Sequence, residues 1–169
     1  MSSRNQFLLL NVLGGIAVLG SYYWGFVSYP QLRSEFWGEV PQSLKGLYTL
    51  NMFFAAAGYI AAFVYFFVRR PAERFGDLLL PHALILIPSA LWLPLTVAVL
   101  QHPGTLLWWA IRVDLFAVAI GGLWVLANVW RTGAGKARVA VAGAMLFFVL
   151  QTTVLDALIW PAYFSLPTG

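Results

Sequence analysis

Residues 78–100 read LLLPHALILIPSALWLPLTVAVL, a run of the chain that contains no Asp, Glu, Lys or Arg. A helix of about 20 apolar residues is long enough to cross the hydrocarbon core of a bilayer. We therefore predict that residues 78–100 form a transmembrane helix, for which lipid is the solvent.

Four more apolar runs surround this one, and the predicted spans are residues 6–27, 46–68, 78–100, 105–130 and 138–162. Hydrophobic residues make up 61% of the chain and charged residues 9%, whereas roughly a quarter of the residues in soluble domains are charged. A domain of 169 residues cannot hide so much apolar surface in one core. The sequence predicts an all-α, polytopic membrane protein: a single transmembrane domain over residues 1–169, built as a bundle of five transmembrane helices.

The positive charges predict the orientation of the bundle. With five spans, one side of the membrane receives most of the Lys and Arg residues, namely Arg4, Arg69, Arg70, Arg74, Arg131, Lys136 and Arg138. The other side receives only Arg33 and Lys45. Because positive charge accumulates on the cytoplasmic side, we expect a cytoplasmic N-terminus, an external C-terminus and an external loop over residues 28–45. Charges placed in this way predict a lipid bilayer as partner and no nucleic acid, despite the net charge of +4.

The residue inventory excludes several kinds of chemistry. The chain has no Cys and only two His residues, His82 and His102. Disulfides, Cys-ligated metals, thiol catalysis and a multi-histidine metal site are therefore excluded. No catalytic constellation, phosphate loop or metal-ligand spacing is present, so we assign no catalytic residue and no metal ligand, and no cofactor is required. A binding role is favoured over an enzymatic one.

Polar residues within the predicted spans carry most of the functional information. Arg112 and Asp156 lie at similar depth in two spans that run in opposite directions, so we expect an ion pair between them. An unpaired charge at that depth would cost several kcal/mol. Trp108 lies one turn before Arg112 and could stack on its guanidinium. Asp114 points to the opposite side of its helix, toward a strip of small residues suited to helix packing.

Aromatic residues gather in the predicted outer half of the bundle, together with these polar groups. The candidate ligand-binding residues are Tyr22, Trp37, Tyr48, Asn51, Trp92, Trp108, Arg112, Asp156 and Trp160. A belt of Trp and Tyr at the membrane interface would explain some of the aromatic residues without any ligand. The pairing of Arg112 with Asp156 could equally be structural, and both interpretations stay open at this point.

The layout resembles the tryptophan-rich sensory protein and translocator protein family (the peripheral benzodiazepine receptor). Three stretches carry the resemblance: Tyr29-Pro30-Gln31-Leu32 with Phe36-Trp37-Gly38-Glu39-Val40-Pro41, then Tyr48 with Asn51-Met52 and Ala55-Ala56, and Trp92-Leu93-Pro94. The chain departs from the family pattern in having one Pro after the loop Trp, Leu93 where Thr is common, and Asp156 where Asn is expected.

The resemblance implies a pocket near the long first loop that binds a large apolar or planar ligand, a tetrapyrrole or a sterol-like lipid, for sensing or transport. A bound porphyrin or haem would then be the ligand, and Arg112 could pair with its propionate. Two other interpretations stay open: an accessory subunit of a larger membrane complex, and a small intramembrane isomerase that acts on a sterol or isoprenoid through Asp114 or Asp156. Gly14, Gly15 and Gly20 would also permit a homodimer.

Overall fold

The computed structural model describes residues 1–164, apart from the side chain of Ala72, and this range contains helices and no strand. Its long helices are α1 (Ser3–Ser28), α2 (Gln42–Arg69), α3 (Gly76–Gln101), α4 (Thr105–Arg131) and α5 (Lys136–Val149). α5 continues into a π-helix, η4 (Leu150–Ile159), and a 3-10 turn, η5 (Trp160–Ala162). The other 3-10 turns are η1 (Pro30–Leu32), η2 (Glu35–Trp37) and η3 (Ala72–Arg74).

The prediction of an all-α bundle with five membrane-spanning helices is confirmed. Within the described residues, five helical segments of 26–28 residues have a mean hydropathy of 1.5 to 2.2. At about 1.5 Å per residue, each segment is about 40 Å long, which is enough to cross a bilayer. The observed helices contain the predicted spans and begin or end a few residues beyond most of them, as at the N-terminus of α1, where the Ser2 hydroxyl accepts a hydrogen bond from the Asn5 amide.

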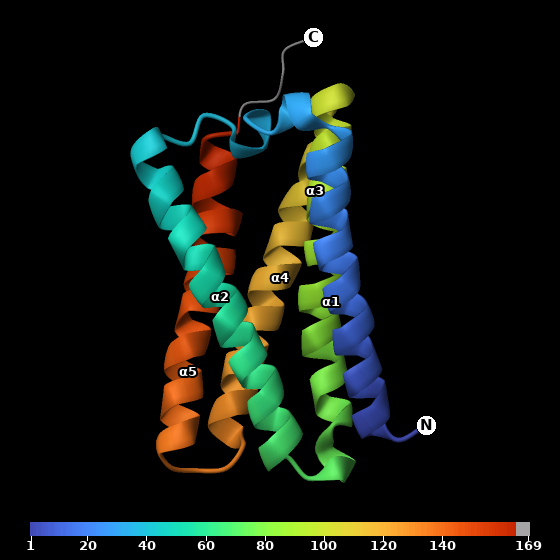
Figure 1. The fold of residues 1–169 in the computed structure, drawn as a ribbon, viewed down its shortest axis with the longest axis vertical. Helices are drawn as coiled ribbons and strands as arrows, with labels where there is room; N and C mark the ends of the chain where they lie inside the picture. The colour runs from blue at the N-terminus through green and yellow to red at the C-terminus, as the bar shows by residue number, and fades with distance from the viewer. Residues whose placement is uncertain (165–169) are drawn as a thin grey trace.

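The helices form an open ring. α1 packs on α3, α3 on α4, α4 on α5 and η4, and α5 on α2, whereas α1 and α2 meet through side chains in the N-terminal half, where the Tyr59 hydroxyl donates to Asn11 at 2.6 Å (Figure 1). Figure 1 shows that α1 and α2 stand apart at the end of the bundle that carries η1 and η2, and approach each other toward the opposite end. We call these the loop end and the N-terminal end.

The N-terminal half of the bundle has a single core. Side chains from all five long helices meet there, among them Phe7, Phe66, Leu78, Val125 and Met145. α2 and α5 approach so closely that a Cβ on Gly58 would overlap the Ala144 carbonyl oxygen. Within a bilayer the hydrophobic effect does not drive helices together, because lipid tails are as apolar as the side chains. Membrane helices therefore gain packing energy from close backbone approach of this kind.

The core of the loop-end half is divided in two. One cluster joins α2, α3, α4 and the C-terminal segment around Tyr48, Ile111 and Trp160. The other joins η2 and α3, around Phe36 and Leu93, with Tyr22 of α1 packed against it. Trp92 packs against both clusters.

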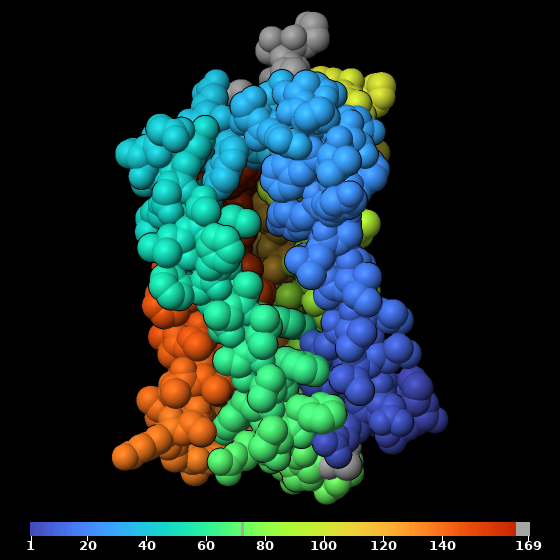
Figure 2. Space-filling view, in the orientation of Figure 1, coloured from blue at the N-terminus to red at the C-terminus, as the bar shows by residue number. Residues whose placement is uncertain are grey.

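A hollow follows from this division. Figure 2 shows it on the face between α1 and α2, in the loop-end half, with parts of α3, α4 and the C-terminal helix visible at its floor. The loop that carries η1 and η2 closes it above, where the Glu39 amide donates to the Tyr163 carbonyl at 2.7 Å. We call this hollow the α1–α2 cleft.

Candidate functional site

A chain of aromatic rings joins α1, α3, α4 and η5 in the loop-end half of the bundle. Tyr22 of α1 stacks on Trp92 of α3 with ring centroids 5.7 Å apart, and Trp92 meets Trp160 of η5 edge to face at 5.9 Å. Trp160 contacts Trp108 of α4 at 6.1 Å, and its indole N–H donates to the Phe36 carbonyl at 3.0 Å. Stacked and edge-to-face pairs at these distances are favourable. The structure thus brings four of the sequence-predicted residues together.

Trp37 and Tyr48 lie on the α2 side of the same end. Their rings meet edge to face with centroids 5.9 Å apart. The Tyr48 hydroxyl donates to the Leu155 carbonyl at 2.8 Å, and Tyr48 is only 2% exposed. These contacts fix the loop and the start of α2 against η4, so both residues support one wall of the cleft.

A line of hydrogen-bonded side chains connects α2 to η4, and we call it the polar relay. The Asn51 amide donates to the Gln151 side-chain oxygen at 3.0 Å and also to the Phe147 carbonyl at 3.1 Å. The Gln151 amide in turn donates to Asp156 Oδ1 at 2.7 Å. Asn51 and Gln151 are buried, whereas Asp156, at the end of the relay, is only half-buried.

The π-helix explains the geometry of the relay. In an α-helix, residues five apart point in clearly different directions, because each residue turns the helix by about 100°. A π-helix makes i to i+5 hydrogen bonds and has a wider turn, so Gln151 and Asp156 come onto one face. Pro161 follows directly and cannot donate a backbone hydrogen bond, which ends this geometry. Such π segments are rare and occur frequently at functional sites.

Two carboxylates lie in the loop-end half on different helices, Asp114 on α4 and Asp156 on η4. Asp114 is 7% exposed, and its Oδ2 is buried without a hydrogen-bond partner among the described residues. A buried acceptor that stays unpaired costs about 1–3 kcal/mol, and more when it is charged. Such an atom therefore calls for an explanation other than folding stability.

The expected ion pair between Arg112 and Asp156 is not formed. In the described part of the chain, the one ion pair joins Arg70 and Asp77. The Arg112 guanidinium instead lies over the Phe116 ring, 5.6 Å from its centroid, and Phe116 is 40% exposed on the outside of the bundle. Arg112 is half-buried, and its Nε is buried without a hydrogen-bond partner among the described residues.

Trp108 does not stack on Arg112 either. Its ring lies parallel to that of Phe164, with centroids 5.5 Å apart and an interplanar angle of 11°. Trp108 therefore belongs to the core of the loop end, on the same side as Trp160.

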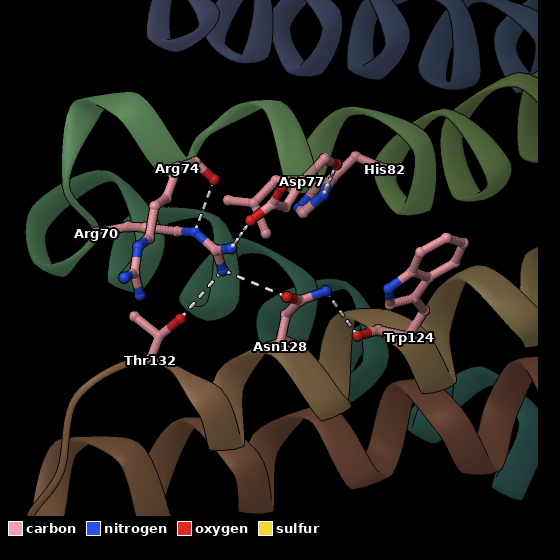
Figure 3. Close-up of polar contacts among 8 residues, drawn as sticks. Arg70, Arg74, Asp77, His82, Trp124, Asn128 and Thr132 are labelled. Carbon is pink, nitrogen blue, oxygen red and sulfur yellow. Dashed lines mark hydrogen bonds and ion pairs between the residues drawn. The ribbon is translucent and has the colours of Figure 1, made fainter.

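The N-terminal half holds a second polar cluster, drawn in Figure 3. The Arg70 guanidinium donates to the Arg74 carbonyl at 2.9 Å, to Asp77 at 3.0 Å, to Thr132 at 3.2 Å and to Asn128 at 3.3 Å. The Arg70 side chain is 7% exposed. These bonds connect the end of α2, the start of α3 and the end of α4. We call this cluster the Arg70 latch, and its hydrogen bonds are those of a structural cluster.

His82 lies in the same half, inside an aromatic box. Its Nδ1 is 2.8 Å from the Leu78 carbonyl, while Phe7, Tyr59 and Phe66 surround the ring. His82 is fully buried, and within the described residues its Nε2 has no partner. Among the described residues, no titratable side chain forms a hydrogen bond with it.

The strip that Asp114 shares with Gly121 does pack closely on α3, since a Cβ on Gly121 would overlap the Pro81 carbonyl oxygen. One residue of the polar relay was not predicted from the sequence. Gln151 was missed altogether. The signal in the sequence is a polar amide within an apolar span, five residues before Asp156. In an α-helix, side chains five residues apart do not share a face.

The chain was compared with protein-family models, with curated proteins and with solved structures, and none of them matches it.

Proposed function

We propose that this protein binds a large apolar or planar molecule, a sterol-like lipid or a tetrapyrrole, in the α1–α2 cleft. The molecule reaches the cleft from the bilayer, because the gap between α1 and α2 faces sideways. Sensing or transport of such a molecule is the role we infer. The resemblance to the translocator protein family, drawn from the sequence, supports the same ligand class.

The observation that carries the proposal is the incomplete burial of side chains that point into the bundle. Tyr22 and Trp92 stack across α1 and α3, and Asp156 accepts a hydrogen bond from Gln151 of its own helix, yet each of the three is only half-buried. Aromatic walls with a few converging polar groups are the usual composition of small-molecule sites. The divided core leaves room for the body of a flat ligand between Tyr22 on one side and the polar relay on the other.

The closed N-terminal half supports binding rather than free passage. Below the cleft, Phe66, Met145 and Phe148 belong to the continuous core of all five helices. A ligand that enters between α1 and α2 therefore has a floor under it. Transport would need a partner or a rearrangement of that core.

Tryptophan fluorescence in nanodiscs tests the proposal. Protoporphyrin dimethyl ester, which is planar and uncharged, is expected to quench the emission with saturation. Trp92→Phe is expected to weaken binding by about three- to tenfold, since an aromatic pair contributes about 0.5–1.5 kcal/mol. Trp109→Phe is the matched control, because Trp109 lies at the same end but is 60% exposed on the outside. Quenching without saturation, or equal loss in both variants, would refute the proposed site.

We also propose that the loop end faces the outside of the cell and that the N-terminus is cytoplasmic. The basic residues Arg70, Arg74, Arg131 and Lys136 all belong to the N-terminal end, which supports this orientation. The chain has no native Cys, so single cysteines report cleanly. A membrane-impermeant maleimide added to intact cells should label Pro103→Cys and should label Lys136→Cys only after permeabilisation. The reverse pattern would overturn the orientation.

A further inference from the structure

We propose that the N-terminal end of the bundle binds the head group of an anionic phospholipid, in a basic pocket at the turn between α4 and α5. α4 ends at Arg131 and α5 begins at Lys136, and Figure 1 shows the turn between them at the N-terminal end. The pocket lies at the opposite end of the bundle from the α1–α2 cleft, so the proposal does not depend on the ligand of that cleft.

The pocket is open and has a volume of about 540 Å³. It is lined by Gly135, Lys136, Arg138, Val139 and Ala140. Two of these residues are basic, and the surrounding stretch, residues 130–140, contains a third basic residue but no acidic one. Sites for small molecules usually have volumes of about 300–1,000 Å³. The pocket is therefore large enough for a phosphodiester head group, and its charge attracts an anion.

The Arg138 guanidinium is held in place, but not by an acid. Its Nη1 donates to the Gly133 carbonyl at 3.3 Å, and the group lies over the Trp130 ring, 5.1 Å from the ring centroid. Its Nε is buried and has no acceptor within residues 1–164. Within that range the one ion pair joins Arg70 and Asp77, so the basic side chains of the pocket have no carboxylate partner there. A guanidinium offers paired N–H donors that match the oxygens of a phosphate.

The positions of the two basic residues are unfavourable for α5 itself. Lys136 and Arg138 lie in the first turn of the helix, where the helix dipole already places a partial positive charge. No side chain caps this turn, because Gly135 occupies the N-cap position. A phosphate bound in the pocket would offset the repulsion and accept hydrogen bonds from the first-turn amides.

The apolar side of the pocket favours a lipid over a soluble phosphate. Val139 lines the pocket and is exposed, and Gly143 and Leu146 are exposed on the same face of α5, four and seven residues further along. The segment is long and apolar enough to span a membrane, so acyl chains can lie along this face below the head group. Phosphatidylcholine carries a cation of its own, which a basic pocket repels. The charge therefore favours a lipid with a net negative charge.

Native mass spectrometry of the full chain, released from detergent micelles, measures the binding of single lipids. The two probes are dioleoylphosphatidylglycerol and dioleoylphosphatidylcholine, which have the same acyl chains and a phosphodiester but differ in net charge. We expect the first phosphatidylglycerol to bind at least about tenfold more tightly than phosphatidylcholine. Equal affinities of the two lipids would overturn the proposal.

A double variant, Lys136→Gln with Arg138→Gln, tests whether the pocket causes this preference. The affinity for phosphatidylglycerol should fall to that for phosphatidylcholine, and unchanged binding of phosphatidylcholine would report an intact fold. Arg69→Gln with Arg74→Gln is the matched control, because it removes two exposed basic residues from the same end of the bundle. The control should keep the native preference. Equal loss in both double variants would mean that the lipid responds to the overall charge of this end, and would contradict a defined site.

Glycerophosphoglycerol separates a lipid site from a site for a soluble phosphate ester, because it is the same head group without acyl chains. At the concentration of the lipid it should leave the bound phosphatidylglycerol in place. Displacement of the lipid at that concentration would show that the acyl chains contribute nothing, and the assignment of a phospholipid would be wrong.

Discussion

The N-terminal half and the loop-end half of the bundle are built from the same five helices, yet their side chains are packed differently. In the N-terminal half one cluster joins all five helices around Phe66 and Met145. In the loop-end half the buried side chains form two clusters. One joins α2, α3, α4 and the C-terminal segment, the other joins η2 and α3 with Tyr22 of α1 beside it, and Trp92 packs against both. Trp92 and the hydrogen bond from Trp160 to Phe36 join the two clusters, and the α1–α2 cleft opens in the same half of the bundle.

The polar groups show a less complete contrast. Arg70 is buried, and its guanidinium donates to four acceptors from three segments. Asp114 Oδ2 in the loop-end half is buried without a partner among the described residues, but so is His82 Nε2 in the N-terminal half. The two halves therefore differ in their apolar packing and in the Arg70 latch, and we propose that the ligand binds in the loop-end half.

The largest expected effect is the loss of stability when a large side chain is removed from the core of the N-terminal half. Phe66 is fully buried, and Phe66→Ala should lower the free energy of unfolding by about 3–5 kcal/mol, because it removes packing and leaves a cavity. Phe53→Ala is the control, since Phe53 is 73% exposed to lipid. Unfolding in mixed detergent micelles measures both. A loss as small as that of the control would mean that this half is not the stable one.

Removal of the Arg70 latch should have the next largest effect. Arg70→Met keeps the length of the side chain but leaves Asn128, Thr132 and Asp77 without their donor. We expect a loss of about 2–4 kcal/mol in the same assay, because partners of a lost buried charge stay unpaired. Arg69→Met, which changes an exposed neighbour, should cost less than about 0.5 kcal/mol.

In the loop-end half, loss of a polar group should stabilise the protein. Asp114→Leu removes a buried carboxylate with an unpaired oxygen, so we expect the free energy of unfolding to rise by about 1–3 kcal/mol. Lower stability would show that Asp114 has a structural partner, and the contrast between the halves would then be lost.

The smallest effect should come from Tyr22. No hydrogen bond from its hydroxyl is found among the described residues, although its ring stacks on Trp92. Tyr22→Phe keeps the ring and should change stability by less than about 0.5 kcal/mol. In Tyr59→Phe, by contrast, the hydroxyl that donates to Asn11 at 2.6 Å is lost, which should cost about 1 kcal/mol. Equal costs would show that Tyr22 is bonded as firmly as Tyr59.

The spans could be predicted from the sequence because hydropathy and helix length are properties of each segment alone. Residues 78–100 are long and apolar enough to cross a bilayer whatever their neighbours do. The depth of a residue along its helix determines which end of the bundle it occupies. The sequence could therefore also predict which aromatic residues share the loop end: Tyr22, Trp92, Trp108 and Trp160.

The pairing of groups across helices could not be predicted in this way. Arg112 and Asp156 do lie in corresponding parts of their helices, but a pair also requires that the two faces point at each other. Arg112 lies beside Phe116 on the outer face of α4, while η4 turns Asp156 toward Gln151. The rotation of a helix about its axis is set by its packing with neighbours, and a π-helix changes it within a single turn.

Arg70 is a second example of a contact that the sequence does not predict. By its sequence position it is one of several basic residues that orient the bundle in the membrane. Its neighbour Arg69 is exposed, whereas Arg70 turns inward to Asn128 and Thr132. Successive residues of a helix point about 100° apart, so Arg69 remains on the surface while Arg70 lies at the centre of the Arg70 latch.

Photo-cross-linking with a diazirine-bearing sterol tests directly whether the loop-end half holds the ligand. The probe is added to protein in nanodiscs, and labelled peptides are mapped with and without excess unlabelled sterol. If the α1–α2 cleft is the site, the adducts that excess sterol removes will lie on the segments around Tyr22, Trp92 and Asp156. Adducts confined to outward residues such as Trp109 and Phe116, and unaffected by competition, would contradict the presence of a binding cleft.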